Sequence, residues 1–412
     1  MFVTHIQPFK AIRPVRDKVQ LVASRPYYAY TKRMLAAKLK SNPYTFIHII
    51  NPEFHKKNKT KPNTKGRFLR VKERFNEFFE EGIFLQDEKD SIYVYRQTKD
   101  GHQYLGFIGG ADLNEYKAGK IKKHEETITK REATFSKYLK TVGFNAEPVL
   151  LFHKHHDDLN SLLLAQTKVR AEYEYTTTDR VKHELWVIDD ENTLQEIQHH
   201  FNDIEETYIA DGHHRCASSA RYFEESEIKS KVNQHALAFF ISDQKLNILD
   251  FNRVVKDLNG LSIKSYLEII SNSFIIKEKP GKTYAPKQSG EISMYLEQKW
   301  YSLTPLPELI NYEHPVERLD TYILTQLILQ PILNIQDLKE DERIDFVSGD
   351  KGMKGLKKVV DKGVAKVAFG LFPISPRQLI DVADANLIMP PKSTWIEPKL
   401  RSGLTIYPLE TE

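Results

Sequence analysis

The sequence has almost no cysteine, since Cys216 is the only one among 412 residues. A single thiol excludes an internal disulfide framework and a zinc site built from several cysteines, and it fits a reducing compartment. No apolar run approaches membrane-spanning length, and residues 1–8 lack the basic segment and apolar run of a signal peptide. We therefore expect a cytoplasmic protein without a membrane partner.

An excess of charge of one sign is also missing. The formal net charge is only +4, so charge alone gives no case for a nucleic-acid partner, and we expect none. The length suits two or three domains. Alternating strand and helix patterns predict a mixed α/β (α+β) chain: an N-terminal α/β part over residues 1–110, a core over 111–260, and a C-terminal α+β part over 261–412.

The most informative stretch is DGHHR, residues 211–215, between a predicted buried strand and a predicted helix. The first amides of a helix have no internal partner and the helix dipole favours negative charge there, so the turn predicts an anion site. Gly212 lets the backbone approach a ligand, and Arg215 can hold two phosphate oxygens. The alternative is a polar turn whose side chains satisfy local carbonyls, but this dense packing of polar residues favours phosphate.

A second polar stretch, residues 121–127 (IKKHEET), precedes a predicted helix. Thr129 and Glu132 have the spacing of a capping box, which predicts Thr129 as the N-cap. His124 and Glu125 then lie just before a helix start, and a carboxylate beside a histidine can accept a proton from a substrate hydroxyl. Alternatively, Glu125 only complements the helix dipole.

Three other segments carry predictions of their own. Residues 389–395 (MPPKSTW) form either a phosphate contact, through one cation and two hydroxyls, or a plain proline-bounded loop. Residues 153–158 (HKHHDD) look like a metal cluster, but their spacing matches no standard zinc pattern, so we expect an exposed loop. Residues 46–50 (FIHII) predict a strand.

The chain resembles the bacterial family catalogued as domain of unknown function 1015 over essentially its full length. Six blocks in the right order carry this resemblance: residues 8–14 (PFKAIRP), 42–46 (NPYTF), 93–97 (YVYRQ), 124–127 (HEET), 210–215 (ADGHHR) and 389–394 (MPPKST). The resemblance implies a ParB/sulfiredoxin-like core with a mixed sheet. Relatives of that fold include kinases that phosphorylate free L-serine to O-phospho-L-serine.

The resemblance also implies residue roles. Glu125 becomes the candidate general base beside His124, and Asp211 a ligand for Mg²⁺ or for the serine amine. The donor phosphates are expected to be bound by Gly212, His213, His214 and Arg215, together with Lys392, Ser393 and Thr394. Substrate contacts are expected from Arg96, Arg131 and Tyr27. Mg²⁺ is the expected cofactor, and ATP, ADP or pyrophosphate the expected phosphoryl donor.

Two departures from the family pattern matter. Tyr28 stands where the family usually has an aspartate, so the role of that aspartate is absent or replaced here. A sulfiredoxin needs its cysteine inside the turn, where this chain has His213, while Cys216 follows on the helix. A thiol redox role is therefore disfavoured.

Three functions compete. The first is a small-molecule kinase acting on L-serine or a similar acceptor, as a monomer or homodimer, because positioning and charge neutralisation dominate phosphoryl transfer. The second is a non-catalytic, nucleotide- or phosphometabolite-binding regulatory protein, which needs the turn but no base. The third is a ParB-like DNA-partitioning protein, placed last because the sequence shows no glycine-containing helix-turn-helix and no strong basic face.

Overall fold

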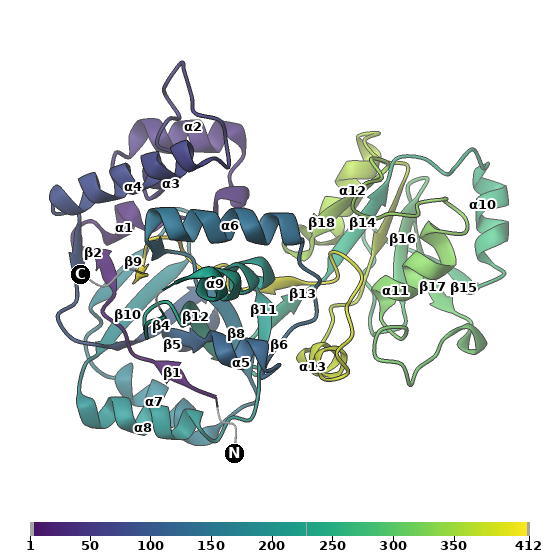
Figure 1. Ribbon diagram of the computed structural model, residues 1–412. Helices are drawn as coiled ribbons and strands as arrows, with labels where there is room; N and C mark the ends of the chain where they lie inside the picture. The colour runs from purple at the N-terminus through teal and green to yellow at the C-terminus, as the bar shows by residue number, and fades with distance from the viewer. Residues whose placement is uncertain (1–3, 228, 410–412) are drawn as a thin grey trace. The chain divides into compact units, whose positions relative to one another are not determined.

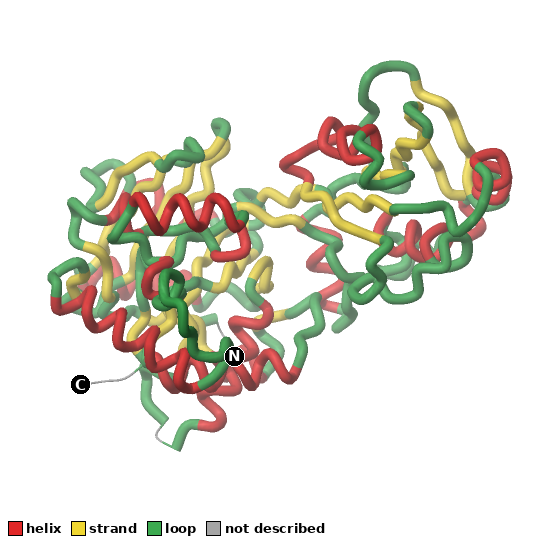
Figure 2. Tube along the Cα trace, turned by 90° about the horizontal axis from the view of Figure 1, so that it is seen from above, coloured by secondary structure: helices red, strands yellow, loops and turns green. Residues whose placement is uncertain are grey.

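The structure is a computed structural model that describes residues 4–227 and 229–409, without the side chain of Tyr28. The chain forms two compact units. Unit 1 comprises Met1–Lys122, Glu126–Leu246 and Pro398–Glu412, and unit 2 comprises Lys123–Glu125 and Asn247–Glu397. Helices and strands occur in both units, which confirms the mixed α/β class (Figures 1 and 2). The division at residues 110 and 260 stays a prediction.

Unit 1 is built on a nine-stranded mixed sheet of order β6-β11-β8-β12-β5-β4-β10-β9, with β1 paired to β5. The pairs β11–β6 and β12–β8 are parallel, and the other pairs are antiparallel. Its strands are β1 (Ile6–Gln7), β4 (Ile92–Lys99), β5 (His102–Asp112), β6 (Ile121–Lys122), β8 (Val149–His153), β9 (Tyr173–Thr176), β10 (Lys182–Ile188), β11 (Thr207–Asp211) and β12 (His235–Ser242). Two small pairs join β2 (Ile12–Pro14) to β3 (Phe84–Gln86), and β7 (Phe144–Asn145) to β21 (Tyr407–Pro408).

Helices cover this sheet in layers. In Figure 1, α7 and α8 lie below it and α6 lies above it, where α6 packs against α4 and α9. The helices of unit 1 are α1 (Val19–Val22), α2 (Lys32–Ser41), α3 (Ile47–Ile50), α4 (Lys65–Glu80), α5 (Leu113–Lys117), α6 (Thr129–Val142), α7 (Asp157–Gln166), α8 (Glu191–Phe201) and α9 (His213–Glu225). Phe107, Phe201 and Phe240 meet edge to face in the core between the sheet and α8.

Two local predictions are wrong. The segment of residues 46–50 forms the short helix α3 over Ile47–Ile50, with Phe46 as its N-cap, rather than a strand. Phe46, Ile47 and Ile49 are all fully buried, and a short, mostly apolar run suits either element. Helix α6 begins at Thr129, but its N-cap is Ile128 and no side chain caps it. Glu132 instead accepts a hydrogen bond from the hydroxyl of Thr127, so the predicted capping box does not form.

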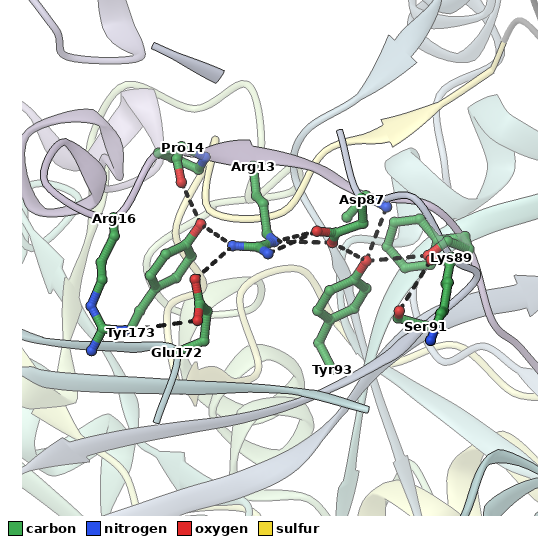
Figure 3. A network of polar contacts seen from close by, with 11 residues as sticks. Arg13, Pro14, Arg16, Asp87, Lys89, Ser91, Tyr93, Glu172 and Tyr173 are labelled. Atoms are coloured by element: carbon green, nitrogen blue, oxygen red, sulfur yellow. Dashed lines mark hydrogen bonds and ion pairs between the residues drawn. The ribbon is translucent and has the colours of Figure 1, made fainter. Parts of the chain in front are cut away.

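The first motif of the resemblance, residues 8–14, is held by a buried polar network (Figure 3). The Arg13 guanidinium donates from Nε to both carboxylate oxygens of Asp87, at 2.8 and 2.9 Å, and from Nη1 to the Tyr173 hydroxyl at 2.7 Å. Burial alone would lower the pKa of Arg13, but the hydrogen bonds and charges of Asp87 and Tyr173 outweigh burial and raise it. Arg13 therefore anchors the entry strand in the core of unit 1.

Unit 2 has a six-stranded antiparallel sheet of order β15-β17-β16-β19-β14-β18. Its strands are β14 (Phe251–Val255), β15 (Phe274–Lys279), β16 (Ile292–Leu296), β17 (Lys299–Pro305), β18 (Ile344–Ser348) and β19 (Val367–Gly370), beside a pair of β13 (Asn247–Leu249) and β20 (Trp395–Glu397). Its helices are α10 (Ile263–Ile270), α11 (Asp320–Leu324), α12 (Gly352–Asp361) and α13 (Pro376–Asp384). Among the described residues, no helix combines the length and apolar character needed to cross a membrane.

Candidate functional site

The predicted turn forms as expected between β11 and α9. Tyr208, Ile209 and Ala210 are buried in the sheet, and α9 starts at His213. Gly212 joins the two elements with a φ of 102°, a conformation that a side chain rarely adopts. A Cβ atom at this position would lie 2.7 Å from Nε of Arg215, so only glycine lets the guanidinium fold back against the turn.

Two cations converge on the Asp211 carboxylate. Arg215 Nη2 lies 2.6 Å from Asp211 Oδ2, and Lys399 Nζ lies 3.1 Å from Asp211 Oδ1. Burial by itself would raise the pKa of Asp211, but the charges of Lys399 and Arg215 outweigh it and hold that pKa well below its usual range. Asp211 is therefore ionised at any physiological pH, and it gathers two positive side chains at the N-terminus of a helix.

Glu147 frames the other side of Arg215. Its Oε2 lies 3.4 Å from Arg215 Nη1, and its Oε1 accepts a hydrogen bond of 2.8 Å from the Ser402 hydroxyl. The cavity bounded by these residues, Asp211 and Lys399 has a volume of about 10 Å³. That is room for about one water molecule, so a phosphate group enters only if Arg215 or Lys399 turns away from Asp211.

A larger cavity of about 530 Å³ is also lined by Arg215. Aromatic side chains make up much of its wall, and polar groups are placed among them. The lining includes Tyr27, Phe46, Asn51, Arg67, Phe68, Phe135, Tyr138, Phe144, Asn145, Glu147 and Arg215. Apolar walls with a few convergent polar groups are typical of small-molecule sites, and this volume lies in their usual range.

Two of the predicted segments meet within unit 2. The amide of Met389 donates a hydrogen bond of 3.0 Å to the carbonyl oxygen of His124, so the HEET and MPPKST motifs lie side by side. The His124 residue is buried, whereas Glu125 is exposed. Ser393 donates to the carbonyl of Pro390 at 2.6 Å. The backbone bond therefore places the HEET motif beside Met389, at the start of the loop that carries Lys392, Ser393 and Thr394. The roles of these residues and of Glu125 stay predictions.

The loop of the MPPKST motif is held by a cation–π contact and by a hydrogen bond from a buried arginine. Lys392 has a φ of 58°, a left-handed conformation, and its ammonium lies over the Phe251 ring at 5.5 Å. Beneath the loop, the fully buried Arg253 donates from Nη2 to the carbonyl of Pro391 at 3.3 Å. Burial lowers the pKa of Arg253 to about 9.

The three residues assigned to substrate binding have different surroundings. Tyr27 lines the larger cavity together with Arg215. Arg131 is exposed on the first turn of α6 and lies outside the lining of both cavities. Arg96 is paired with Glu184 across β4 and β10 through bonds of 2.6 and 2.7 Å, and it stacks on Trp186 at 5.1 Å. Their roles stay predictions, and the side chain of Tyr28 lies outside what the structure describes.

Sequence reasoning missed Lys399 and Glu147. Lys399 lies 188 positions from Asp211 along the chain and belongs to no motif that pointed to phosphate. Its only local signal is a lysine after Pro398, shortly after the MPPKST motif. Glu147 likewise precedes Pro148 in an ordinary-looking turn before β8.

The surroundings of Asp211 do not fit a magnesium ion. One carboxylate oxygen is bonded to Lys399 and the other to Arg215, so a divalent cation there would face two positive charges at short range. Mg²⁺ prefers carboxylates and phosphates free of competing cations. The arrangement instead suits an anion that would replace Asp211 as the partner of Arg215 or Lys399.

Comparison with known proteins gives one family and several distant structures. Residues 6–322 match the family described as "Protein of unknown function (DUF1015)". The chain matches none of the curated proteins compared with it. A free serine kinase in complex with AMP aligns with a TM-score of 0.38 and 12% identity, over 73% of this chain and 92% of that one. The protein SbnI with C-terminal truncation from Staphylococcus aureus gives 0.39 and 10%, over 73% and 87%. A conserved hypothetical protein from Pyrococcus furiosus gives 0.35 and 13%, over 71% and 91%.

Proposed function

We propose that this chain, which belongs to the DUF1015 family of proteins of unknown function, is a phosphotransferase that moves a phosphoryl group from a nucleotide to a small alcohol. The observation that carries the proposal is the convergence of Arg215 and Lys399 on the turn at Gly212, at the start of α9. Phosphoryl transfer needs positioned cations and helix amides more than covalent chemistry. The turn offers both kinds of group.

The cavities favour a nucleotide over pyrophosphate as donor. The space of about 530 Å³ next to Arg215 has room for a nucleoside among its aromatic walls, and Arg215 lines both cavities. A nucleotide would place its base and sugar among Phe135, Tyr138 and Phe144. Its phosphates would replace Asp211 as the partner of Arg215. Pyrophosphate would leave that cavity unused.

L-Serine is the proposed acceptor, on the resemblance set out above. Its hydroxyl oxygen attacks the terminal phosphorus of the donor, its proton passes to the Glu125 carboxylate, and the nucleotide leaves with one phosphate fewer. Glu125 is exposed, so it can meet a substrate that arrives from solvent. In this proposal, His124 shapes the HEET segment beside Glu125. His213 and His214 belong to the DGHHR turn and donate hydrogen bonds to phosphate oxygens.

The test incubates purified protein with Mg²⁺, one donor at a time (ATP, ADP or pyrophosphate) and L-serine, followed by mass spectrometry for O-phosphoserine. Glu125→Gln keeps the shape of the side chain and removes the base, so turnover should fall by about 10²–10⁴. Glu126→Gln is the matched control, because it removes an equally exposed neighbouring carboxylate and should leave turnover unchanged.

Absence of product with every donor and a panel of amino acids would refute the kinase. A regulatory binding protein would then be indicated if ADP still raised the melting temperature, if Arg215→Ala abolished that rise, and if Glu125→Gln left it intact.

A further inference from the structure

A cluster of two histidines and two aspartates lies where α7 begins and α8 ends. His156 is the N-cap of α7, and Asp158 follows in its first turn. His200 is in the last turn of α8, and Asp203 comes just after that helix. The two helices pack against each other below the sheet of unit 1 (Figure 1), and possible ligand atoms of His156, His200 and Asp203 lie within 4.8 Å of one another.

The atoms that could bind a cation are already close together. Nε2 of His156 lies 3.7 Å from Oδ2 of Asp203, and Nδ1 of His200 lies 3.8 Å from the same oxygen. Oδ2 of Asp158 lies 3.9 Å from Nδ1 of His200. In a tetrahedral zinc site with bonds of about 2.0–2.1 Å, neighbouring ligand atoms are about 3.3 Å apart, so small side-chain rotations would close this cluster around an ion.

Charge and access also suit a divalent cation. The Asp203 carboxylate lies among the possible ligands and the Asp158 carboxylate lies beside His200, so both negative charges favour a dication. The imidazoles are partly covered, with side-chain exposures of 22% for His156 and 19% for His200, while Asp203 is 54% exposed and open to solvent. The carbonyl end of α8 adds a partial negative charge beside His200.

We propose that His156, His200 and Asp203 form a binding site for a divalent transition metal of the zinc class. Imidazole nitrogens select Zn²⁺, Co²⁺ or Ni²⁺ over Mg²⁺ and Ca²⁺, which prefer oxygen ligands. Three protein ligands leave one tetrahedral position, which a water molecule or the nearby Asp158 carboxylate would fill. The ion would fasten the start of α7 to the end of α8, and it is separate from any ion that accompanies a phosphoryl donor.

The HKHHDD stretch, residues 153–158, contributes only part of this site. The exposed loop predicted for residues 153–158 forms only in part: His153 is buried at the end of β8, α7 begins at Asp157, and only His156 belongs to the group of possible ligands. The other two ligands come from the end of α8, so no short spacing pattern could identify the set. The prediction of a wholly exposed loop is therefore wrong at His153.

Metal binding has a specific local consequence. The amide of Leu159 donates to Nδ1 of His156 at 3.4 Å, as the N-cap bond of α7, which leaves the ring proton on Nε2. A metal at Nε2 moves that proton to Nδ1, so the ring must give up this long hydrogen bond. His156→Asn is therefore an informative variant, because asparagine is a good N-cap that provides no imidazole.

The experiment uses full-length, untagged protein that has been freed of metal with a chelator and is then titrated with Co²⁺ alone. Tetrahedral binding should produce visible absorption bands that saturate at one ion per chain, and Zn²⁺ should raise the melting temperature. His200→Ala and His156→Asn should lose both effects. His199→Ala removes the neighbouring histidine, which is outside the cluster, and should retain them.

Failure of the wild-type protein to bind Co²⁺ or to be stabilised by Zn²⁺ would overturn the proposal. So would binding that survives His200→Ala or His156→Asn, because the ligands would then lie elsewhere. None of these outcomes depends on phosphotransferase activity, so the two proposals stand or fall separately.

Discussion

Substitution of Gly212 by alanine tests whether the turn binds an anion by holding Arg215 beside the first amides of α9. Alanine at a φ of 102° is strained, and its Cβ would lie 2.7 Å from both Nε and Nη2 of the guanidinium. The end of an arginine side chain is flexible, so the guanidinium would move away and break its 2.6 Å bond to Asp211. The variant therefore combines backbone strain with the loss of one ion pair.

A second glycine separates the two effects. Gly119 also has a positive φ, 75°, but an added Cβ would meet no atom within 4 Å. Alanine in a left-handed conformation costs about 1–2 kcal/mol at either position. The partly exposed ion pair between Arg215 and Asp211 contributes up to about 1 kcal/mol more. Gly212→Ala should therefore lower the free energy of unfolding by about 1 kcal/mol more than Gly119→Ala.

Urea denaturation of the two variants measures this difference, and calorimetric titration with ADP measures its effect on anion binding. We expect Gly119→Ala to bind ADP as the wild type does and Gly212→Ala to bind it more weakly, because Arg215 no longer lies beside the amides of α9. Equal stability losses together with unchanged ADP binding in Gly212→Ala would refute the reasoning, since they would show that the position of Arg215 is independent of the turn.

Three further predictions concern single side chains. Lys399→Met should weaken ADP binding by about 1.5–3 kcal/mol, the contribution of one charged hydrogen bond, and unchanged calorimetric affinity would exclude Lys399 from the anion site. Burial raises the pKa of Asp320 from 3.8 to about 7, so the folded state keeps a proton that the unfolded chain releases. The free energy of unfolding should then fall by up to about 4 kcal/mol between pH 4 and 7, and Asp320→Asn should remove that slope in urea titrations. Burial also raises the pKa of Cys216 to about 12, so a thiol reagent should label this residue only after unfolding, and labelling of folded protein would contradict its burial.

The local features of the candidate site could be predicted from sequence because they depend on near neighbours. A buried strand, a glycine and a helix follow one another within a few residues, and each has its own pattern of apolar spacing. The end of α6 is likewise a local feature, because Gly143 follows the helix with a φ of 78° and caps it. Sequence reasoning failed at residues 46–50, where a short, mostly apolar run interrupted only by His48 suits a strand or a helix.

Only the tertiary structure determines which residues far apart in the sequence meet at the turn, in the α7–α8 cluster and across the sheet. Lys399 reaches Asp211 from 188 positions away, and His200 meets His156 because α7 and α8 pack together. Likewise Arg96, expected to contact substrate, pairs with Glu184 because β4 and β10 are neighbours in the sheet. Sequence patterns report which face of an element is apolar, whereas the packing of those faces determines which distant charges meet. The sequence alone therefore predicted a mixed α/β protein with a strand–glycine–helix turn suited to an anion, and the fold supplied the second cation beside that turn and the candidate metal ligands.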